Sequence, residues 1–448
     1  AVCDFPSHRQ RVVRVRPGTD DGEPSAFPTG NQARTGRRLT AVPEHLQLCF
    51  VSMHTSPANL PGSGDAGGMN VVERSQALAL AALGHRVDLV TRRSHPDDPD
   101  AVELAPGVVL RHLDAGPRTP LPKSVIDDHI EEFSTGLAGL GDYDLFHSHH
   151  WMSGVAALPV AASRGVPHVQ SYHSVAALPG SPLSAGEVPE SSRRVAGEAL
   201  VARDSALVVA ISAAEAHTVI ERCGADPDRV EIVSPGVDRE LFRPRRPGED
   251  VWTPDVPAPN GYVLFAARLQ PLKGPDLAIG ALAAVAPAIR PHLVVAGDVS
   301  ADFADYAAEL DRLVDDLGLT GQVSFVGPQP RERLARLMRD ARITLVPSHS
   351  ETFGLVALEA EASGTPVIAA SAGGLRESVA HGETGQLMDS REPADWGRAL
   401  TLLLTTPGLL ARMGTVARVH ARRFDWGWTA RRLSALYRGL LDDVAGHS

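Results

Sequence analysis

Apolar residues along the chain fall into two kinds of pattern that alternate with each other. Residues 46–52 form a short, nearly continuous apolar run, and a glycine-rich loop at 61–68 follows it. Residues 69–83 then carry apolar side chains at helical spacing up to Gly84, and a second apolar run follows at 86–91. The order strand, loop, helix, strand predicts a βαβ unit, in which the two strands are parallel.

The same alternation continues through the first half of the chain and then repeats in the second half. Further strands are predicted at 108–113, 145–147, 167–171, 206–211 and 230–233, with helices at 155–162 and 191–203. The rhythm stops at 235–238, and residues 243–260 are rich in proline and poor in apolar side chains, which is typical of a linker. The second series predicts strands at 262–266, 292–296, 323–326, 343–346 and 366–370, helices at 275–284, 306–317, 331–339 and 355–362, and a final helix at 426–442. Two doubly wound α/β halves should enclose a deep cleft, where ligands usually bind.

Composition and charge exclude several classes of protein. The 448-residue chain has a net charge of −11, whereas a general nucleic-acid binder needs a basic face. No run of about 18 uncharged apolar residues occurs, so no integral membrane segment is expected. The cysteines at 3, 49 and 223 are scattered, which favours a reducing cytoplasm, and Cys49 should be a buried thiol. The first 45 residues lack apolar periodicity, and we expect a disordered or loosely attached extension.

A glycine-rich turn follows the first predicted strand and opens the first predicted helix. Its sequence is Gly64-Asp-Ala-Gly67-Gly68-Met-Asn70. Glycines let backbone amides approach a phosphate closely, and the start of a helix favours negative charge. The spacing is not that of the GxGxxG dinucleotide pattern, and an ordinary tight turn explains it about equally well.

Two cations follow the first strand of the second half. Arg268 and Lys273 stand five residues apart beyond strand 262–266, at the edge of the sheet that faces the predicted cleft. Two positive charges placed there would neutralise a diphosphate leaving group. A solvated basic loop before helix 275–284 is the alternative, with about equal weight.

Two glutamates eight residues apart flank the start of helix 355–362. Glu351 precedes the helix, and Glu359 lies inside it after an apolar run that indicates burial. A buried carboxylate requires a partner, and a ribose diol fits that role, although a half-exposed helix glutamate is the alternative. The backbone amides at the helix start, those of Phe353, Gly354 and Leu355, are available to a sugar or phosphate oxygen.

Histidines gather at the ends of two neighbouring predicted strands. His147, His149 and His150 end one strand, and His173 follows the next. Because side chains alternate along a strand, this pattern does not place three nitrogens on one face, and zinc binding is disfavoured. Hydrogen bonding to a sugar or an acceptor fits the group better, and ordinary packing is the preferred interpretation for any single one of them.

Taken together, the motifs resemble those of the retaining family 4 glycosyltransferases, which have the two-domain GT-B fold. The segment Glu351-Thr-Phe-Gly-Leu-Val-Ala-Leu-Glu359 is similar to the family's E-x7-E signature, and the resemblance covers residues 46–441. It implies five parts: an extension at 1–45, an acceptor-binding Rossmann-like domain at 46–240, a linker at 241–260, a nucleotide-sugar donor-binding domain at 261–424, and a helix at 425–448 that packs back toward the first domain.

The resemblance also implies roles for individual residues. The catalytic set would be Arg268, Lys273, Glu351 and His173. The donor-binding set would be Gly67, Gly68, Asn70, Phe353, Gly354, Leu355 and Glu359. The acceptor-binding set would be Lys123, His150, Ser174 and Arg194. In this scheme the cations and the Gly67–Gly68 loop hold the diphosphate, and Glu359 holds the ribose.

Within the family, the motifs are most similar to the inositol phosphate glycosyltransferases of mycothiol biosynthesis. The similar segments are 52–57, 64–70, 147–149, 224–227 and 269–273. That group has tyrosine at the position of His150, threonine at Ser174 and usually lysine at Pro179, so the acceptor pocket of this chain is altered. Lys123 and Arg194 remain in place, which keeps an anionic acceptor open.

The resemblance therefore implies retaining transfer of a sugar from a nucleoside diphosphate, UDP or GDP, to a small polar acceptor. That acceptor would be inositol phosphate-like or belong to an antibiotic pathway, and relatives suggest a homodimer. No metal or other cofactor is expected, because the Asp-x-Asp triplets at 142–144 and 226–228 precede strands and the one at 98–100 lies well beyond a strand. Two alternatives stay open: an S-glycosyltransferase acting on a thiol such as ergothioneine in lincosamide biosynthesis, and a nucleotide-sugar epimerase on the same fold.

Overall fold

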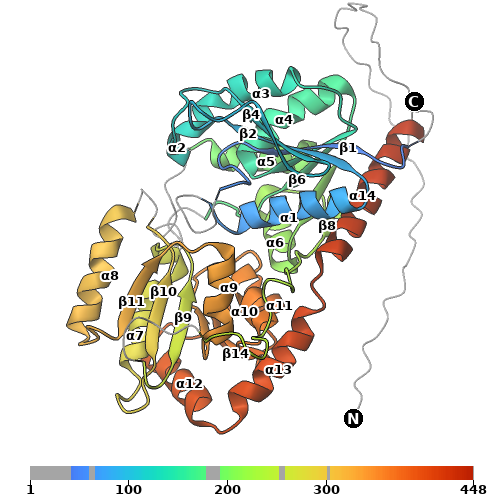
Figure 1. Ribbon diagram of the computed structural model, residues 1–448. Helices are drawn as coiled ribbons and strands as arrows, with labels where there is room; N and C mark the ends of the chain where they lie inside the picture. Colours follow the sequence, from blue (N-terminus) through green and yellow to red (C-terminus); the bar gives the residue numbers. More distant parts are fainter. Residues whose placement is uncertain (1–41, 60–65, 178–191, 252–257, 300–302, 447–448) are drawn as a thin grey trace, which may run out of the picture. The chain divides into compact units, whose positions relative to one another are not determined.

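The chain folds into two α/β lobes, each built on its own sheet (Figure 1). The structure is a computed structural model that describes residues 42–59, 66–177, 192–251, 258–299 and 303–446. The sheet of the N-terminal lobe has eight strands in the order β3-β4-β2-β1-β5-β6-β7-β8, and that of the C-terminal lobe has six in the order β11-β10-β9-β12-β13-β14. Neighbouring strands are parallel except for β3 and β4. The predicted pair of doubly wound parallel sheets is confirmed.

The N-terminal lobe alternates strands and helices along the chain. Its strands are β1 Gln47–Ser52, β2 Arg86–Arg92, β3 Ala101–Ala105, β4 Val108–Leu113, β5 Leu145–His149, β6 His168–Ser171, β7 Leu207–Ala210 and β8 Val230–Ile232. Its helices are α1 Gly68–Ala82, α2 Lys123–Ile126, α3 Ile130–Ala138, α4 Trp151–Arg164, α5 Arg194–Asp204 and α6 Ala213–Thr218, with short turns at η1 Asp127–His129, η3 Val219–Cys223 and η4 Pro227–Arg229.

The C-terminal lobe repeats the plan with one fewer strand on each side of its first strand. Its strands are β9 Tyr262–Ala266, β10 His292–Ala296, β11 Val323–Gly327, β12 Thr344–Val346, β13 Val367–Ala370 and β14 Gly385–Met388. Its helices are the short turn η5 Pro271–Lys273, α7 Pro275–Ala283, α8 Ala304–Asp316, α9 Arg331–Asp340, α10 Leu355–Ser363, α11 Leu375–Ser378, α12 Pro393–Thr405 and α13 Leu409–Ala421. The last helix, α14 Trp426–Gly446, follows them.

Burial explains which strands the pattern revealed. Every residue of β9 is buried, and such a central strand reads as a continuous apolar run. Every residue of β5 is buried as well, although the strand ends in His-Ser-His, and only its residues 145–147 were predicted. Cys49 of β1 is likewise a buried free thiol, as expected. The antiparallel edge strand β3 exposes its first three residues and was not predicted, because it carries no continuous apolar signal.

The last helix packs against the N-terminal lobe. Leu433, Tyr437 and Leu441 of α14 lie in one buried cluster with Leu48 of β1 and Leu80 of α1. Figure 1 shows α14 alongside α1. The end of the chain therefore contributes to the core of its first half.

In each sheet the order of the strands reverses beside the first strand of the lobe. In the N-terminal sheet β1 lies between β2 and β5, and in the C-terminal sheet β9 lies between β10 and β12. Helices that leave such neighbouring strands on opposite sides open a crevice at the carboxyl ends, which is where doubly wound sheets bind ligands. The glycine-rich turn follows β1 and Arg268 follows β9, so both motifs lie at these points.

Within the described ranges, no single helix is both long and apolar enough to cross a membrane. One bent helix pair, Pro393–Thr405 with Leu409–Gly446, has the necessary length and composition only when its two parts are taken together, and these parts meet at 98°.

Candidate active site

Two adjoining cavities lie at the carboxyl ends of the strands. The larger has a volume of about 420 Å³ and is lined by residues of both lobes. The smaller has a volume of about 130 Å³ and lies mainly against the C-terminal lobe. Both are lined by Gly67, Gly68, Arg268 and Leu355, so these residues mark the junction between them.

The glycine turn meets the C-terminal lobe at that junction. A Cβ added at Gly67 would lie 3.8 Å from Nε of Arg268, and one at Gly68 would lie 3.4 Å from a methyl group of Leu355. Three predicted motifs that are up to 288 residues apart in sequence are therefore in contact. Larger side chains on the turn would fill the space between the two lobes.

Asn70 holds the glycine turn in shape. Its Oδ1 accepts the backbone N–H of Gly67 at 2.8 Å, and its Nδ2 donates to Oγ1 of Thr55 at 3.0 Å and to the carbonyl of Ser56 at 2.8 Å. The side chain is buried although the residue lines the larger cavity. These bonds make Asn70 a support for the loop, and the donor contact that the resemblance implies stays a prediction.

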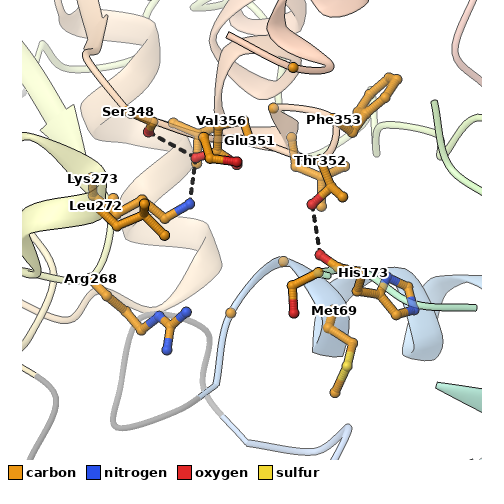
Figure 2. A pocket seen from close by; sticks show the side chains of 18 of the residues that line it. Met69, His173, Arg268, Leu272, Lys273, Ser348, Glu351, Thr352, Phe353 and Val356 are labelled. Carbon is orange, nitrogen blue, oxygen red and sulfur yellow. Dashed lines mark hydrogen bonds and ion pairs between the residues drawn. The ribbon is translucent and has the colours of Figure 1, made fainter. Parts of the chain in front are cut away.

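Lys273 is paired with Glu351 in the larger cavity (Figure 2). Nζ of Lys273 lies 2.5 Å from Oε1 of Glu351, and Ser348 donates its hydroxyl proton to the same oxygen at 2.9 Å. Both charged side chains keep about a fifth of their surface exposed. Sequence reasoning placed both residues in the site but did not foresee that they bind each other.

Glu359 lies in the smaller cavity and has a protein partner. Nη2 of Arg331 is 2.9 Å from its Oε1. Burial raises the pKa of Glu359, and the Arg331 charge opposes that rise. The prediction that Glu359 is buried and needs a partner is confirmed, but the partner present is an arginine that sequence reasoning missed. Its signal was available, because Arg331 opens the helix after predicted strand 323–326.

The start of α10 lines the larger cavity with backbone. The Phe353 side chain is buried against Phe424, with ring centroids 5.6 Å apart, so only its main chain is available to a ligand. Gly354 has φ 98°, and a Cβ there would lie 2.5 Å from a methyl group of Leu375, so the position requires glycine. The first amides of α10, including that of Leu355, have no partner within their own helix and suit an anion or a sugar oxygen.

The histidines divide into packed and cavity-lining members. His147 is buried between Tyr437, whose hydroxyl lies 2.7 Å from Nδ1, and Ser171. Nδ1 of His149 lies 2.8 Å from Nε2 of His173, and burial lowers the pKa of His173 to about 3. Across the described parts of the chain, no three His, Cys, Asp or Glu side chains come together as a metal site would require.

Two of the histidines lie on a strained backbone. His150 has φ 72° and His173 has φ 59°, both in the region that favours glycine. The His150 ring lies 4.3 Å from that of His54, and both line the larger cavity. Burial is the main cause that lowers the pKa of both rings. The charge of Lys123 lowers the pKa of His54 further, and the neighbouring His54 does the same for His150, so both rings are neutral near pH 7. Such strain clusters at functional sites.

The acceptor-side residues are arranged differently from the prediction. Lys123 and Ser174 line the larger cavity, but Arg194 does not. Arg194 is buried, pairs with Glu198 at 2.7 Å, and donates from Nη2 to Oγ of Ser174 at 3.2 Å. Arg194 is therefore a support behind Ser174. A missed cation, Arg222, lines the cavity instead.

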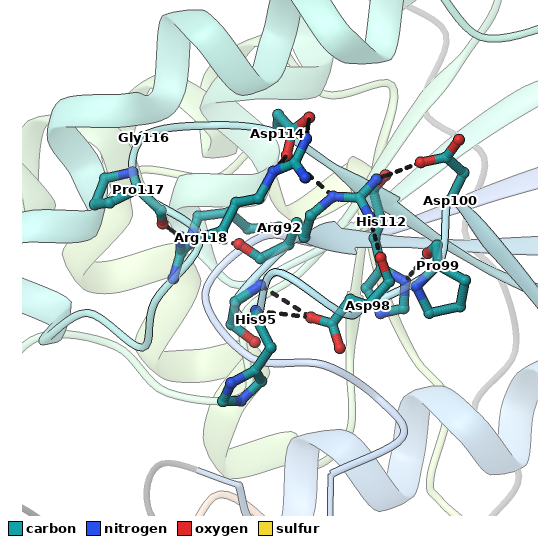
Figure 3. Close-up of polar contacts among 12 residues, drawn as sticks. Arg92, His95, Asp98, Pro99, Asp100, His112, Asp114, Gly116, Pro117 and Arg118 are labelled. Carbon is teal, nitrogen blue, oxygen red and sulfur yellow. Dashed lines mark hydrogen bonds and ion pairs between the residues drawn. The ribbon is translucent and has the colours of Figure 1, made fainter.

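A cluster of arginines fixes the segment that leads to Lys123 (Figure 3). Arg92 is buried and donates to the carbonyls of Pro117 at 2.7 Å and Thr119 at 2.6 Å. The neighbouring Arg93 pairs with Asp100 and lies 3.0 Å from Asp114. The carboxylate of the 98–100 triplet that faces this cluster is thus bound to an arginine.

Comparisons with known proteins agree with this geometry. Residues 66–241 match the model described as Glycosyltransferase Family 4, and residues 250–420 match that described as Glycosyl transferases group 1. The D-inositol 3-phosphate glycosyltransferase of Acidothermus cellulolyticus is 40% identical, over 88% of this chain and 90% of its own length. The protein of the same name from Thermomonospora curvata is 41% identical, over 89% and 96%.

Solved structures show the same architecture. Sucrose-phosphate synthase from Thermosynechococcus elongatus superposes with a TM-score of 0.80 at 29% identity, covering 89% of this chain and 100% of its own. The Anabaena protein HepE, solved with UDP and glucose, gives 0.68 at 21% identity, covering 88% and 99%. The chain therefore belongs to the family 4 glycosyltransferases and has their two-domain GT-B fold.

Proposed function

We propose that the chain transfers a sugar from a nucleoside diphosphate donor to a hydroxyl group of an inositol phosphate, with retention of configuration and without a metal ion. The observation that carries the proposal is the junction of the two cavities, where the Gly67–Gly68 turn touches Arg268 and Leu355. A diphosphate at that junction would meet the amides that open α1 and the charge of Arg268. Its two ends would then extend into the two cavities.

The contents of each cavity support this orientation of the donor. The smaller cavity holds Glu359, a buried carboxylate that can accept hydrogen bonds from ribose hydroxyl groups. The larger cavity holds Glu351 and the first amides of α10, which can bind sugar hydroxyl groups. HepE is a family-fold neighbour solved with UDP and glucose, which makes UDP the first nucleotide to test.

The transfer itself exchanges one bond at the anomeric carbon. The bond to the diphosphate oxygen breaks as the bond to the acceptor oxygen forms on the same face, and the acceptor proton passes to the departing phosphate. Arg268 and Lys273 would stabilise the negative charge that grows on that phosphate, and the loss of one such group typically costs about 2.7–4 kcal/mol of barrier. No protein nucleophile is needed in this scheme.

The N-terminal wall and the relatives support the proposed acceptor. Lys123 supplies positive charge there, and two relatives at about 40% identity carry the name D-inositol 3-phosphate glycosyltransferase. The neutral rings of His54 and His150 can exchange hydrogen bonds with cyclitol hydroxyl groups. A phosphorylated cyclitol combines both features in one molecule.

The test is a matched acceptor assay on the purified chain. UDP-sugars and GDP-sugars are supplied with inositol 3-phosphate, with inositol, or with ergothioneine as the thiol, each in the presence and absence of EDTA. We expect product with inositol 3-phosphate at least tenfold faster than with inositol, and no effect of the chelator. Preference for the thiol, equal use of inositol, or loss of activity in EDTA would contradict the corresponding part of the proposal.

A further inference from the structure

The capping motif at the start of α6 also makes hydrogen bonds to residues outside its own helix. Ser212 is the N-cap residue, and its Oγ accepts the backbone N–H of Glu215 at 3.0 Å. The Glu215 carboxylate reaches back and accepts the backbone N–H of Ile211 at 2.7 Å. These two bonds satisfy the N–H groups of Glu215 and Ile211, so the N–H groups of Ala213 and Ala214 need another partner. The Ser212 hydroxyl makes a further bond to the C-terminal lobe, and Glu215 lines the larger cavity.

Ser212 reaches across to the C-terminal lobe. Its hydroxyl donates to the backbone carbonyl of Thr352 at 2.6 Å. Thr352 lies between Glu351 and Phe353, in the loop that lines the cavity, and its own hydroxyl donates to the carbonyl of His173 at 2.7 Å (Figure 2). One loop residue of the C-terminal lobe is thus bonded at two points to the N-terminal lobe.

Glu215 holds the other end of the same path. Its carboxylate lines the larger cavity, near the backbone of His173. Burial raises the pKa of Glu215 to about 7, while the bond from the Ile211 N–H and the nearby backbone of His173 oppose the rise. His173 is strained at φ 59°, and a strained backbone of this kind persists only where its neighbours fix it from several sides. Glu215, Thr352 and the ring of His149 are those neighbours.

A second contact joins the same helix start to the C-terminal lobe. The carboxylate of Glu377 accepts the backbone N–H groups of Ala213 at 3.0 Å and Ala214 at 3.1 Å. The start of α6 is therefore held both at Thr352, within the loop of Glu351, and at Glu377 of α11. Small movements of α6 would be passed to that loop.

We propose that Ser212 and Glu215 are positioning residues for glycosyl transfer, acting through Thr352 and His173 to fix the loop of Glu351 against the acceptor-side wall. Reacting groups must approach to about 3–3.5 Å, and a displacement of about 1 Å can cost a hundredfold in rate. The inference rests on the transfer reaction of the family and not on which acceptor is used. Neither residue needs to touch the donor or the acceptor.

The test compares variants that remove single bonds along this path. Ser212→Ala and Thr352→Val should each lower kcat about tenfold, while the dissociation constant for the nucleoside diphosphate stays within twofold. The double variant should lose no more than the worse single variant, because both bonds serve one path. Ser212→Thr and Thr352→Ser, which keep the hydroxyl groups, should restore most of kcat.

Controls separate positioning from general stability. Ser134→Ala removes a hydroxyl bond of 2.8 Å to the carbonyl of Ala156 within the N-terminal lobe, away from the cavity, and should leave kcat unchanged. An unchanged kcat in well-folded Ser212→Ala, additive losses in the double variant, or failure of Ser212→Thr to recover would overturn the inference. If the wild type ignores inositol 3-phosphate, the proposed acceptor is wrong, and the same variants are compared by donor hydrolysis, where the same tenfold loss is expected.

Discussion

The two walls of the larger cavity balance their charges in different ways. On the C-terminal wall each key carboxylate already has a cation: Lys273 lies 2.5 Å from Glu351, and in the adjoining cavity Arg331 lies 2.9 Å from Glu359. The N-terminal wall presents the cation Lys123 beside neutral imidazoles. In the proposed reaction a donor would therefore exchange partners within existing ion pairs, whereas the acceptor would bring its own negative charge to Lys123.

Removing Arg268 should have the largest effect, because it lies where both cavities meet. Arg268→Ala is expected to lower kcat about 100–1000-fold, as the loss of a group that stabilises developing negative charge does. Steady-state rates with saturating donor, together with a melting curve, measure this. Arg203→Ala is the control, because Arg203 pairs with Asp204 on an exposed helix surface. A loss below threefold for Arg268→Ala would contradict the proposed position of the diphosphate at the junction of the two cavities.

Glu359→Gln tests the ion pair between Glu359 and Arg331 in the C-terminal lobe. The amide keeps the shape but loses the charge that holds Arg331 and that would accept ribose hydroxyl groups in the proposed complex. Nucleotide affinity should therefore fall roughly 10-fold or more, as for hydrogen bonds to charged groups. Calorimetric titration with UDP or GDP measures it, and acceptor KM should not change. Glu361→Gln is the matched control, because that buried glutamate binds Thr384 and His420 in the same lobe, away from the cavities.

The pH dependence of nucleotide binding sharpens the same prediction. Burial holds the pKa of Glu359 above its ordinary value, so the carboxylate takes up a proton at a higher pH than a free glutamate does. In the proposed complex the ionised form accepts the ribose hydroxyl bonds, so affinity should fall as pH falls through that raised pKa. The same fall in Glu359→Gln would assign the effect to another group.

The same contrast explains how far the sequence could be interpreted. The motifs of the C-terminal lobe could be found in the sequence because they come as two short pairs, each after a recognisable strand. The members of each pair lie within ten positions of each other: Arg268 with Lys273, and Glu351 with Glu359. The spacing alone could not reveal the bond between Lys273 and Glu351, since 78 residues separate them and only the adjacency of β9 and β12 brings them together.

The N-terminal wall was harder to predict because its residues come from separate short elements. Lys123 and Arg222 lie on short helical turns that the apolar pattern did not reveal. Arg194, which the resemblance assigns to the acceptor, is bound by Glu198 one helical turn later and lies behind Ser174. Asn70, which the resemblance assigns to the donor, also accepts the amide of Gly67. Local hydrogen bonds decided these positions, and no periodicity reports them.

Lys123→Ala tests whether the N-terminal wall binds the negative charge of the acceptor. We expect acceptor KM to rise about fivefold for inositol 3-phosphate, because a partly buried cation that contacts a charged group contributes modestly to binding. The dissociation constant of the nucleotide should stay the same. KM for unphosphorylated inositol should also stay the same, which distinguishes loss of a phosphate contact from damage to the pocket. Equal losses for both acceptors would mean that Lys123 does not contact the phosphate.

Arg222→Ala should give the smallest effect, and its salt dependence is the informative part. Arg222 is an exposed residue of the η3 turn and lines the larger cavity, so solvent screens its charge more than that of the partly buried Lys123. Acceptor KM should rise about twofold at low ionic strength and be indistinguishable from wild type above about 0.5 M salt, where screening acts over only a few ångströms. Rates across a salt series measure this, with Arg203→Ala again as control. If the effect of Arg222→Ala persists in high salt, Arg222 makes a direct, desolvated contact with the acceptor, and the anion-binding part of the N-terminal wall extends to η3.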